Sequence, residues 1–172
     1  MKRKFTASRV AIGGIFVALA LIFSYVESLI PFNFGVPGIK LGLANIVVVT
    51  GLYFLPLPDV CVISFLRILI TGLLFGNLMS LIYSLAGGVL SLLVMILLKR
   101  TGQFSVIGVS MAGGFFHNVG QILTAMLVTF VPEIAYYLPI LMGVGLLTGF
   151  IMGLIASRIL IILNKSHFLK KG

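Results

Sequence analysis

Several polar side chains interrupt long apolar stretches of the sequence, at spacings that would bring them together on a helix. His117, Asn118 and Gln121 lie within one apolar stretch, and Arg67 interrupts another. His117 and Gln121 are four residues apart and share a helix face, which Asn118 nearly shares. Imidazole, guanidinium and amide groups are costly at membrane depth unless each finds a partner, so they indicate a functional site. We predict a polar pocket that these side chains line together.

The residue types in this predicted pocket suit an anionic ligand. Arg67 is always charged, and its guanidinium forks toward carboxylate or phosphate oxygens. Lys40 adds a second positive charge or marks the membrane interface. In the alternative interpretation, Arg67 pairs with Glu27 and the amides bond to backbone groups as a structural network. The candidate ligand-binding residues are Arg67, His117, Asn118, Gln121, Asn45, Lys40 and Glu27.

Composition indicates an integral membrane protein that forms a single domain over residues 1–172. Hydrophobic residues make up 60% of the chain, charged residues 9%, and the mean hydropathy is +1.28. A soluble core of this size does not need so much apolar surface. The net charge of +9 does not indicate nucleic-acid binding, because the basic residues lie at the ends of apolar segments. The single cysteine, Cys61, excludes an intramolecular disulfide.

Glycine, proline and charged residues divide the chain into six apolar segments, each predicted to be a transmembrane helix. The third and fourth segments are separated only by Gly76 and Asn77, so this boundary is the least distinct in the sequence. The predicted spans are 5–30, 41–55, 60–75, 78–98, 105–131 and 138–163. The predicted fold class is therefore all-α and polytopic.

The distribution of basic residues predicts the topology of these six spans. With both termini in the cytoplasm of a bacterial cell, ten of the twelve Lys and Arg residues lie at or near the cytoplasmic side, Lys40 lies outside and Arg67 lies within the membrane. The ten are Lys2, Arg3, Lys4, Arg9, Lys99, Arg100, Arg158, Lys165, Lys170 and Lys171. Helical rise then places His117 near the midplane, and the pocket in the outer half of the bundle.

Small residues recur at helical spacing on three of the predicted spans, which is typical of close helix packing in lipid. On the fourth and sixth spans we expect the small residues to serve internal packing. On the first span, docking to another membrane subunit is an equal alternative. The three stripes are Ala7, Ala11, Gly14 and Ala18; Ser80, Ser84 and Gly88; and Gly145, Gly149, Gly153 and Ser157.

Several of these residues fall in strings that resemble one membrane family over nearly the whole chain. The strings are Pro-Gly-Ile-Lys-Leu-Gly-Leu-Ala-Asn at 37–45, Arg67, Gly87-Gly88, Ile-Gly-Val-Ser at 107–110 and His-Asn-Val-Gly-Gln at 117–121. The chain resembles the family labelled heptaprenyl diphosphate synthase component I, also called the Gx transporter family. That family is similar to the substrate-binding S-components of energy-coupling-factor transporters.

The resemblance implies six helices with cytoplasmic termini and an outward pocket capped by loops. It also implies an Ala-x-x-x-Ala motif on the first helix that docks on a transmembrane coupling subunit, matched here by Ala7 and Ala11. The sequence has no Gly-Lys-Ser/Thr nucleotide-binding loop, so an ATP-driven step would need separate ATPase subunits. No cofactor and no metal site are expected, because no Cys/His cluster is present.

The two family labels imply different functions. Prenyl diphosphate synthesis needs clustered aspartates that hold magnesium, whereas this chain has three separated acids, Glu27, Asp59 and Glu133. We therefore expect no catalytic residues, and a non-catalytic role in heptaprenyl or polyprenyl diphosphate synthesis, for menaquinone side chains, is the alternative. The favoured interpretation is uptake of a small anionic molecule. The resemblance alone suggests that this molecule is a precursor in isoprenoid or quinone metabolism.

Overall fold

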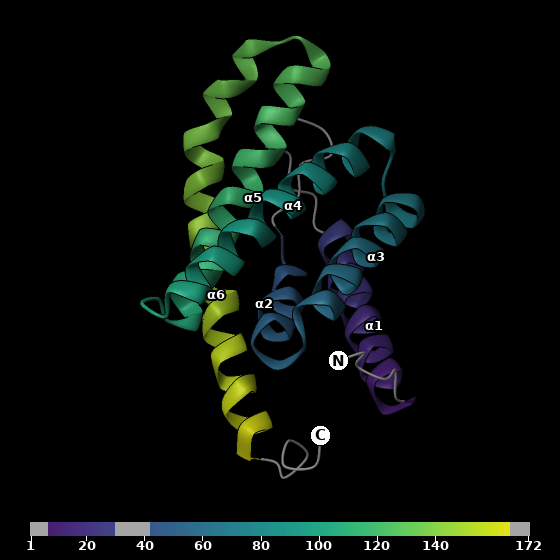
Figure 1. The fold of residues 1–172 in the computed structure, drawn as a ribbon. Helices are drawn as coiled ribbons and strands as arrows, with labels where there is room; N and C mark the ends of the chain where they lie inside the picture. Colours follow the sequence, from purple (N-terminus) through teal and green to yellow (C-terminus); the bar gives the residue numbers. More distant parts are fainter. Residues whose placement is uncertain (1–6, 30–41, 166–172) are drawn as a thin grey trace.

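The computed structural model describes residues 7–29 and 42–165, which form helices joined by short turns and contain no strand (Figure 1). Lys40 lies outside the described residues. This all-helical architecture confirms the all-α part of the predicted fold class. The helices are α1 Ala7–Leu29, α2 Asn45–Phe54, α3 Leu57–Phe75, α4 Leu78–Thr101, α5 Val106–Thr129, the 3₁₀ helix η1 Pro132–Tyr137 and α6 Leu138–Lys165.

Local residues explain where these helices begin and end. The Asn77 side chain accepts a hydrogen bond from Ser80 N at 2.8 Å, so α4 begins as a new helix after α3. Gly102 ends α4 with a φ of 70°. The third helix starts earlier than the predicted residue 60, because Pro58 fits the first turn and Asp59 favours the positive helix start.

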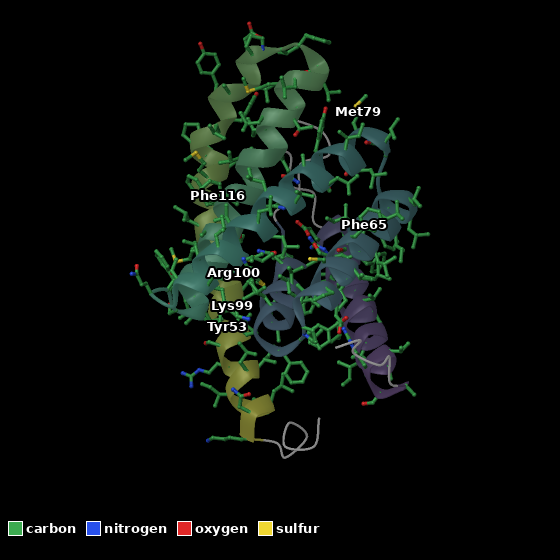
Figure 2. The ribbon with its side chains drawn as sticks, viewed as in Figure 1. Tyr53, Phe65, Met79, Lys99, Arg100 and Phe116 are labelled. Carbon is green, nitrogen blue, oxygen red and sulfur yellow. The ribbon has the colours of Figure 1, made fainter. Side chains whose placement is uncertain are left out.

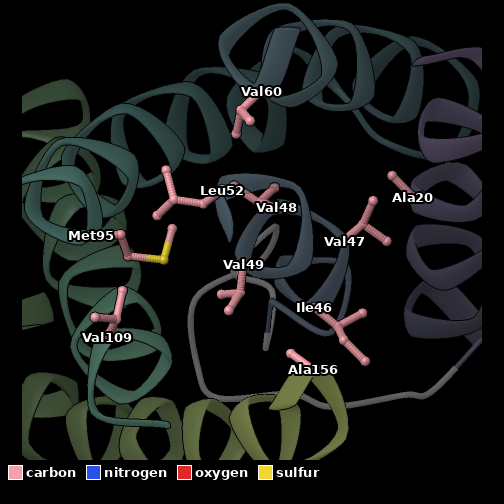
Figure 3. Close-up of a cluster of buried hydrophobic side chains, with 10 residues drawn as sticks. All are labelled: Ala20, Ile46, Val47, Val48, Val49, Leu52, Val60, Met95, Val109 and Ala156. Atoms are coloured by element: carbon pink, nitrogen blue, oxygen red, sulfur yellow. The ribbon is translucent and has the colours of Figure 1, made fainter. Parts of the chain in front are cut away.

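Five of the helices, counting η1 and α6 as one, are long and apolar enough to cross a membrane. The predicted second span instead forms the ten-residue helix α2, which is too short for this group. Eight of its ten residues are buried, and its valines pack among Ala20, Val60, Met95 and Ala156 of the surrounding helices (Figure 3). The short second helix is therefore the core of the bundle, with the longer helices arranged around it.

Successive helices run in alternate directions through the bundle. Arg9 at the start of α1 pairs with Asp59 at the start of α3, with Nη2 and Oδ1 2.5 Å apart. Lys99 near the end of α4 donates to the carbonyl of Leu52 near the end of α2. The end of α6 lies toward the same side of the molecule, at the bottom of Figure 1.

We call this side of the molecule the basic end. Every Lys and Arg of the described ranges except Arg67 belongs to a helix end on this side: Arg9 to the start of α1, Lys99 and Arg100 to the end of α4, and Arg158 and Lys165 to the last two turns of α6. The clustering agrees with the charge pattern that predicted the topology. Assignment of the basic end to the cytoplasm stays a prediction.

The small-residue stripe on α4 and the three glycines of the stripe on α6 are buried inside the bundle, as predicted, whereas Ser157 at the end of the α6 stripe is only half-buried. A Cβ atom built on Gly145 would lie 2.6 Å from Gly114 O, and one on Gly153 would lie 2.8 Å from Ile107 Cα. The backbones of α5 and α6 therefore approach as only glycine allows. On α1, by contrast, Ala7, Ala11 and the other members of the stripe are exposed.

Lys99 joins the short helix α2 to α4 and gives a first stability prediction. Its ammonium donates to Leu52 O and lies 5.0 Å from the centre of the Tyr53 ring, near the basic end (Figure 2). We expect Lys99→Met to lower the free energy of unfolding by about 1–2 kcal/mol, because it removes a charged hydrogen bond and a cation–π contact. The matched control Arg100→Met removes a charge from an exposed neighbour and should change stability little. If both variants lost the same free energy of unfolding in detergent, this role for Lys99 would be contradicted.

Candidate functional site

A small polar cavity lies where α1, α3, α4 and α5 meet. Its volume is about 20 Å³, which is room for roughly one water molecule. Most of the side chains around it are polar or charged, although their helices are strongly apolar. The described residues that line it are Ser24, Glu27, Gly42, Arg67, Ile68, Thr71, Ser84 and His117.

Arg67 and two hydroxyl groups present unused hydrogen-bonding atoms at this cavity. The Arg67 side chain is 93% buried, and its Nε has no hydrogen-bond partner. Thr71, one turn further along α3, and Ser84 on α4 each have a buried hydroxyl that also lacks a partner. A buried polar atom without a partner costs about 1–3 kcal/mol, and more where it is charged. Three such atoms around one cavity indicate a binding site for a group that carries hydrogen-bond acceptors.

Glu27 of α1 contributes a carboxylate to the lining of the cavity. Its Oε1 accepts a hydrogen bond from Gly42 N at 2.5 Å, and its charge attracts that of Arg67. Ser24 lies one turn before Glu27 on the same face of α1. The cavity therefore presents donors from α3 and α4 and one carboxylate from α1. This polarity suits a ligand with several acceptor oxygens and one donor group.

His117 and Gln121 both face α4, consistent with their four-residue spacing. A Cβ atom built on Gly87 would lie 3.2 Å from His117 Nδ1 and 2.9 Å from Gln121 Cγ. Only His117 of the two lines the cavity. Gln121 is fully buried, and neither atom of its amide has a hydrogen-bond partner.

The two predicted asparagines point elsewhere. Asn118 is fully buried against α6, where its Nδ2 donates to Leu141 O at 2.5 Å. Asn45 begins α2, and its Nδ2 lies 3.0 Å from the position of a Cβ atom on Gly113 of α5. The structure thus brings together Arg67, His117 and Glu27. Asn118 and Asn45 were also predicted to line the cavity. The structure instead places them in helix contacts outside it.

Five residues that line the cavity were not singled out as ligand-binding residues from the sequence, and one of them, Gly42, appeared only within the string at 37–45. Thr71 follows Arg67 by four residues, and Ser24 precedes Glu27 by three, so both share a face with a predicted residue. Helical spacing from each charged residue would have identified them. No comparable signal marks Ile68, because buried isoleucines are ordinary on these helices. Ser84 appeared only as a member of the α4 stripe.

The arrangement is suited to binding. Arg67, Thr71 and Ser84 donate toward one small volume, and a carboxylate or phosphate group carries enough acceptor lone pairs to satisfy all three. His117 also lines the cavity, and its Cδ2 lies 3.6 Å from the position of a Cβ atom on Gly42. Within residues 7–29 and 42–165, no three His, Cys, Asp or Glu side chains gather as a metal ion would require.

Comparison with known proteins identifies one family. The model of the family described as heptaprenyl diphosphate synthase component I matches residues 16–159 of the chain. The match includes every described residue that lines the cavity. Neither the curated proteins nor the solved structures give a match to the chain.

Proposed function

We propose, on the premise that the chain belongs to the heptaprenyl diphosphate synthase component I family, that it is a membrane-embedded substrate-binding subunit. In this role it captures a small anionic molecule from outside the cell. It then delivers the molecule inward with a transmembrane coupling subunit and ATPase subunits. The proposal places the basic end in the cytoplasm of a bacterial cell, in agreement with the positive-inside rule.

The observation that carries the proposal is the group of unpartnered atoms at the cavity. Arg67 Nε and the hydroxyls of Thr71 and Ser84 are buried without hydrogen-bond partners. Since each costs stability in the empty protein, a ligand that supplies acceptors recovers that free energy on binding. A guanidinium at membrane depth also selects for a negatively charged group. The small size of the cavity implies that the helices separate slightly when a ligand enters.

The printed family description supports a second candidate function. A chain described as component I of a heptaprenyl diphosphate synthase would act with another component, as a non-catalytic membrane partner. In that case the polar cavity would bind a substrate or product for the soluble subunit. The two proposals share an anion-binding cavity and differ in the protein that receives the ligand.

Purification of the full chain from bacterial membranes separates the two proposals. We expect a small anion to co-purify, detectable by mass spectrometry, together with a membrane coupling subunit and its ATPases. Co-purification of a soluble prenyl synthase, with a higher product yield when the chain is added, would instead support the synthase proposal. Recovery of neither kind of partner and no bound anion would contradict both.

The exposed face of α1 gives a direct prediction for the coupling subunit. Ala7 and Ala11 are exposed small residues four apart, so another helix can approach closely there. We expect Ala7→Leu or Ala11→Leu to reduce recovery of the coupling subunit by about tenfold, because the larger side chain separates the two helices. Ser8→Leu adds similar bulk to an adjacent exposed position and is the matched control. Unchanged recovery with both alanine variants would exclude this docking face.

A further inference from the structure

The polar cavity is adjacent to a larger apolar groove between α3 and α4. The groove has a volume of about 260 Å³ and is lined almost entirely by apolar side chains, among them Phe65, Leu85 and Leu92. Several lining residues, including Phe65 and Leu93, are exposed on the outer surface of the bundle. In a membrane this groove opens toward lipid.

Ile68 is shared by the cavity and the groove. It lines both of them and is 6% exposed. Its Cδ1 lies 2.5 Å from the position of a Cβ atom on Gly88, so the end of the Ile68 side chain packs against the backbone of α4 at this glycine. On α4, Ser84 of the cavity is followed directly by Leu85 of the groove. A rotation of the Ile68 side chain would therefore join a polar hollow to an apolar one.

We propose that the ligand of this site is a single-chain anionic amphiphile, such as an alkyl phosphate monoester. Its head occupies the cavity, and its chain lies in the α3–α4 groove. The inference rests on the proposed binding function and specifies the class of ligand. The positive charge of Arg67 favours an anionic head group. Arg67 and the hydroxyls of Thr71 and Ser84 can donate to phosphate oxygens, and a P–OH group can donate to Glu27.

The direction of the groove defines the pose of the ligand. From Ile68 the groove follows α3 back toward Cys61 and α4 forward to Ile96, which is toward the basic end. The head therefore lies near mid-depth, and the chain extends toward the basic end. Lipid chains compete for the groove at little cost, since they are equally apolar. Binding of the head tethers the ligand chain beside the groove and raises its effective concentration there.

Photolabelling in bilayers tests this pose. The probe is dodecyl phosphate with a diazirine at the end of its chain, added to the full chain in nanodiscs of zwitterionic lipid. We expect the label to concentrate on groove residues of α3 and α4, such as Cys61 and Leu93. Excess unlabelled dodecyl phosphate should reduce this labelling about tenfold, as expected for one shared site. Dodecanol with the same diazirine should label the lipid-exposed faces of all helices without preference.

Matched variants separate the roles of the head and the chain. Val89→Phe fills the rim of the groove from an exposed position, and Leu97→Phe adds the same ring two turns away on α4, outside the groove. We expect Val89→Phe to reduce groove labelling about tenfold and Leu97→Phe to leave it unchanged. Arg67→Gln should also abolish the preference for the groove.

The outcomes also separate this inference from the function on which it rests. If ethyl phosphate binds in an Arg67-dependent manner while the dodecyl probe labels all lipid-exposed faces equally, the amphiphile inference is wrong and the anion-binding function stands. If neither phosphate depends on Arg67, both are wrong. If groove labelling persists in Arg67→Gln, the groove is only a lipid contact, and the inference is again overturned.

Discussion

Replacement of Arg67 by methionine is expected to lower the affinity for small phosphate or carboxylate anions at least about a hundredfold. The reason is that the variant loses a buried charged donor, which is worth several kcal/mol where water is excluded. His117→Ala should have a smaller effect, about tenfold, since it removes one hydrogen-bonding side chain. The measurement is calorimetric titration of the purified protein with ethyl phosphate. Arg158→Met, which removes the same charge at an exposed site of the basic end, is the matched control.

The same variant distinguishes ligand binding from the structural alternative, in which Arg67 only balances Glu27. In that alternative, Arg67→Met leaves a buried carboxylate without its counter-charge, and the free energy of unfolding falls by about 3–5 kcal/mol. The double variant Arg67→Met with Glu27→Gln should then recover most of the stability. A protein that loses stability but binds ethyl phosphate as the wild type does would identify the pair as structural. Loss of binding that persists in the double variant supports the ligand site.

A second large effect is expected at the contact between α5 and α6. Gly145→Ala should lower the free energy of unfolding by about 1–3 kcal/mol, because overpacking at a fixed contact forces the helices apart. The added methyl group would lie 2.6 Å from Gly114 O and 2.7 Å from Asn118 Nδ2, close to the Asn118 bond to α6. Backbone atoms cannot move aside as a flexible side chain can.

Gly143→Ala is the matched control on the same helix. A Cβ atom at Gly143 meets nothing within 4 Å, and the residue is exposed. This change should be neutral or should stabilise α6 by up to about 1 kcal/mol, since alanine loses less backbone entropy in a helix. Both variants can be compared by unfolding in mixed micelles. Equal stability of the two would show that the α5–α6 contact tolerates added volume.

Much of the fold followed from features that need no tertiary information. Charge and hydropathy predicted a polytopic helical protein, and the break at Gly76 and Asn77 was placed correctly because asparagine caps a helix start. The second helix was predicted too long, at 41–55. An apolar stretch looks the same in sequence whether it faces lipid or is enclosed by other helices, so burial on all sides could not be inferred.

The candidate site was predictable only in part, for a similar reason. The cost of burying polar and charged groups marked Arg67 and His117, and both line the cavity. Asn118 is also costly to bury, but its Nδ2 donates to the backbone of α6, while its Oδ1 has no hydrogen-bond partner. The sequence of one helix shows which residues share a face. It does not show which other helix packs against that face. The spacing of His117, Asn118 and Gln121 therefore could not show that adjacent residues face different helices.

The short helix α2 has a consequence for bilayer thickness. Ten residues rise about 15 Å, roughly half of the hydrocarbon layer. In a bilayer the turn at 42–44 would therefore lie at depth, where its carbonyls accept hydrogen bonds from the first residues of α2 but its N–H groups lie outside the helix. Lipid cannot solvate such a backbone, which must be enclosed by protein. The hydrogen bond that Gly42 N donates to Glu27 meets this need at one peptide group. Glu27 therefore has two roles: it lines the cavity, and it accepts the hydrogen bond of a backbone N–H group outside the helices. A substitution of Glu27 would also disturb the entry of the chain into the membrane.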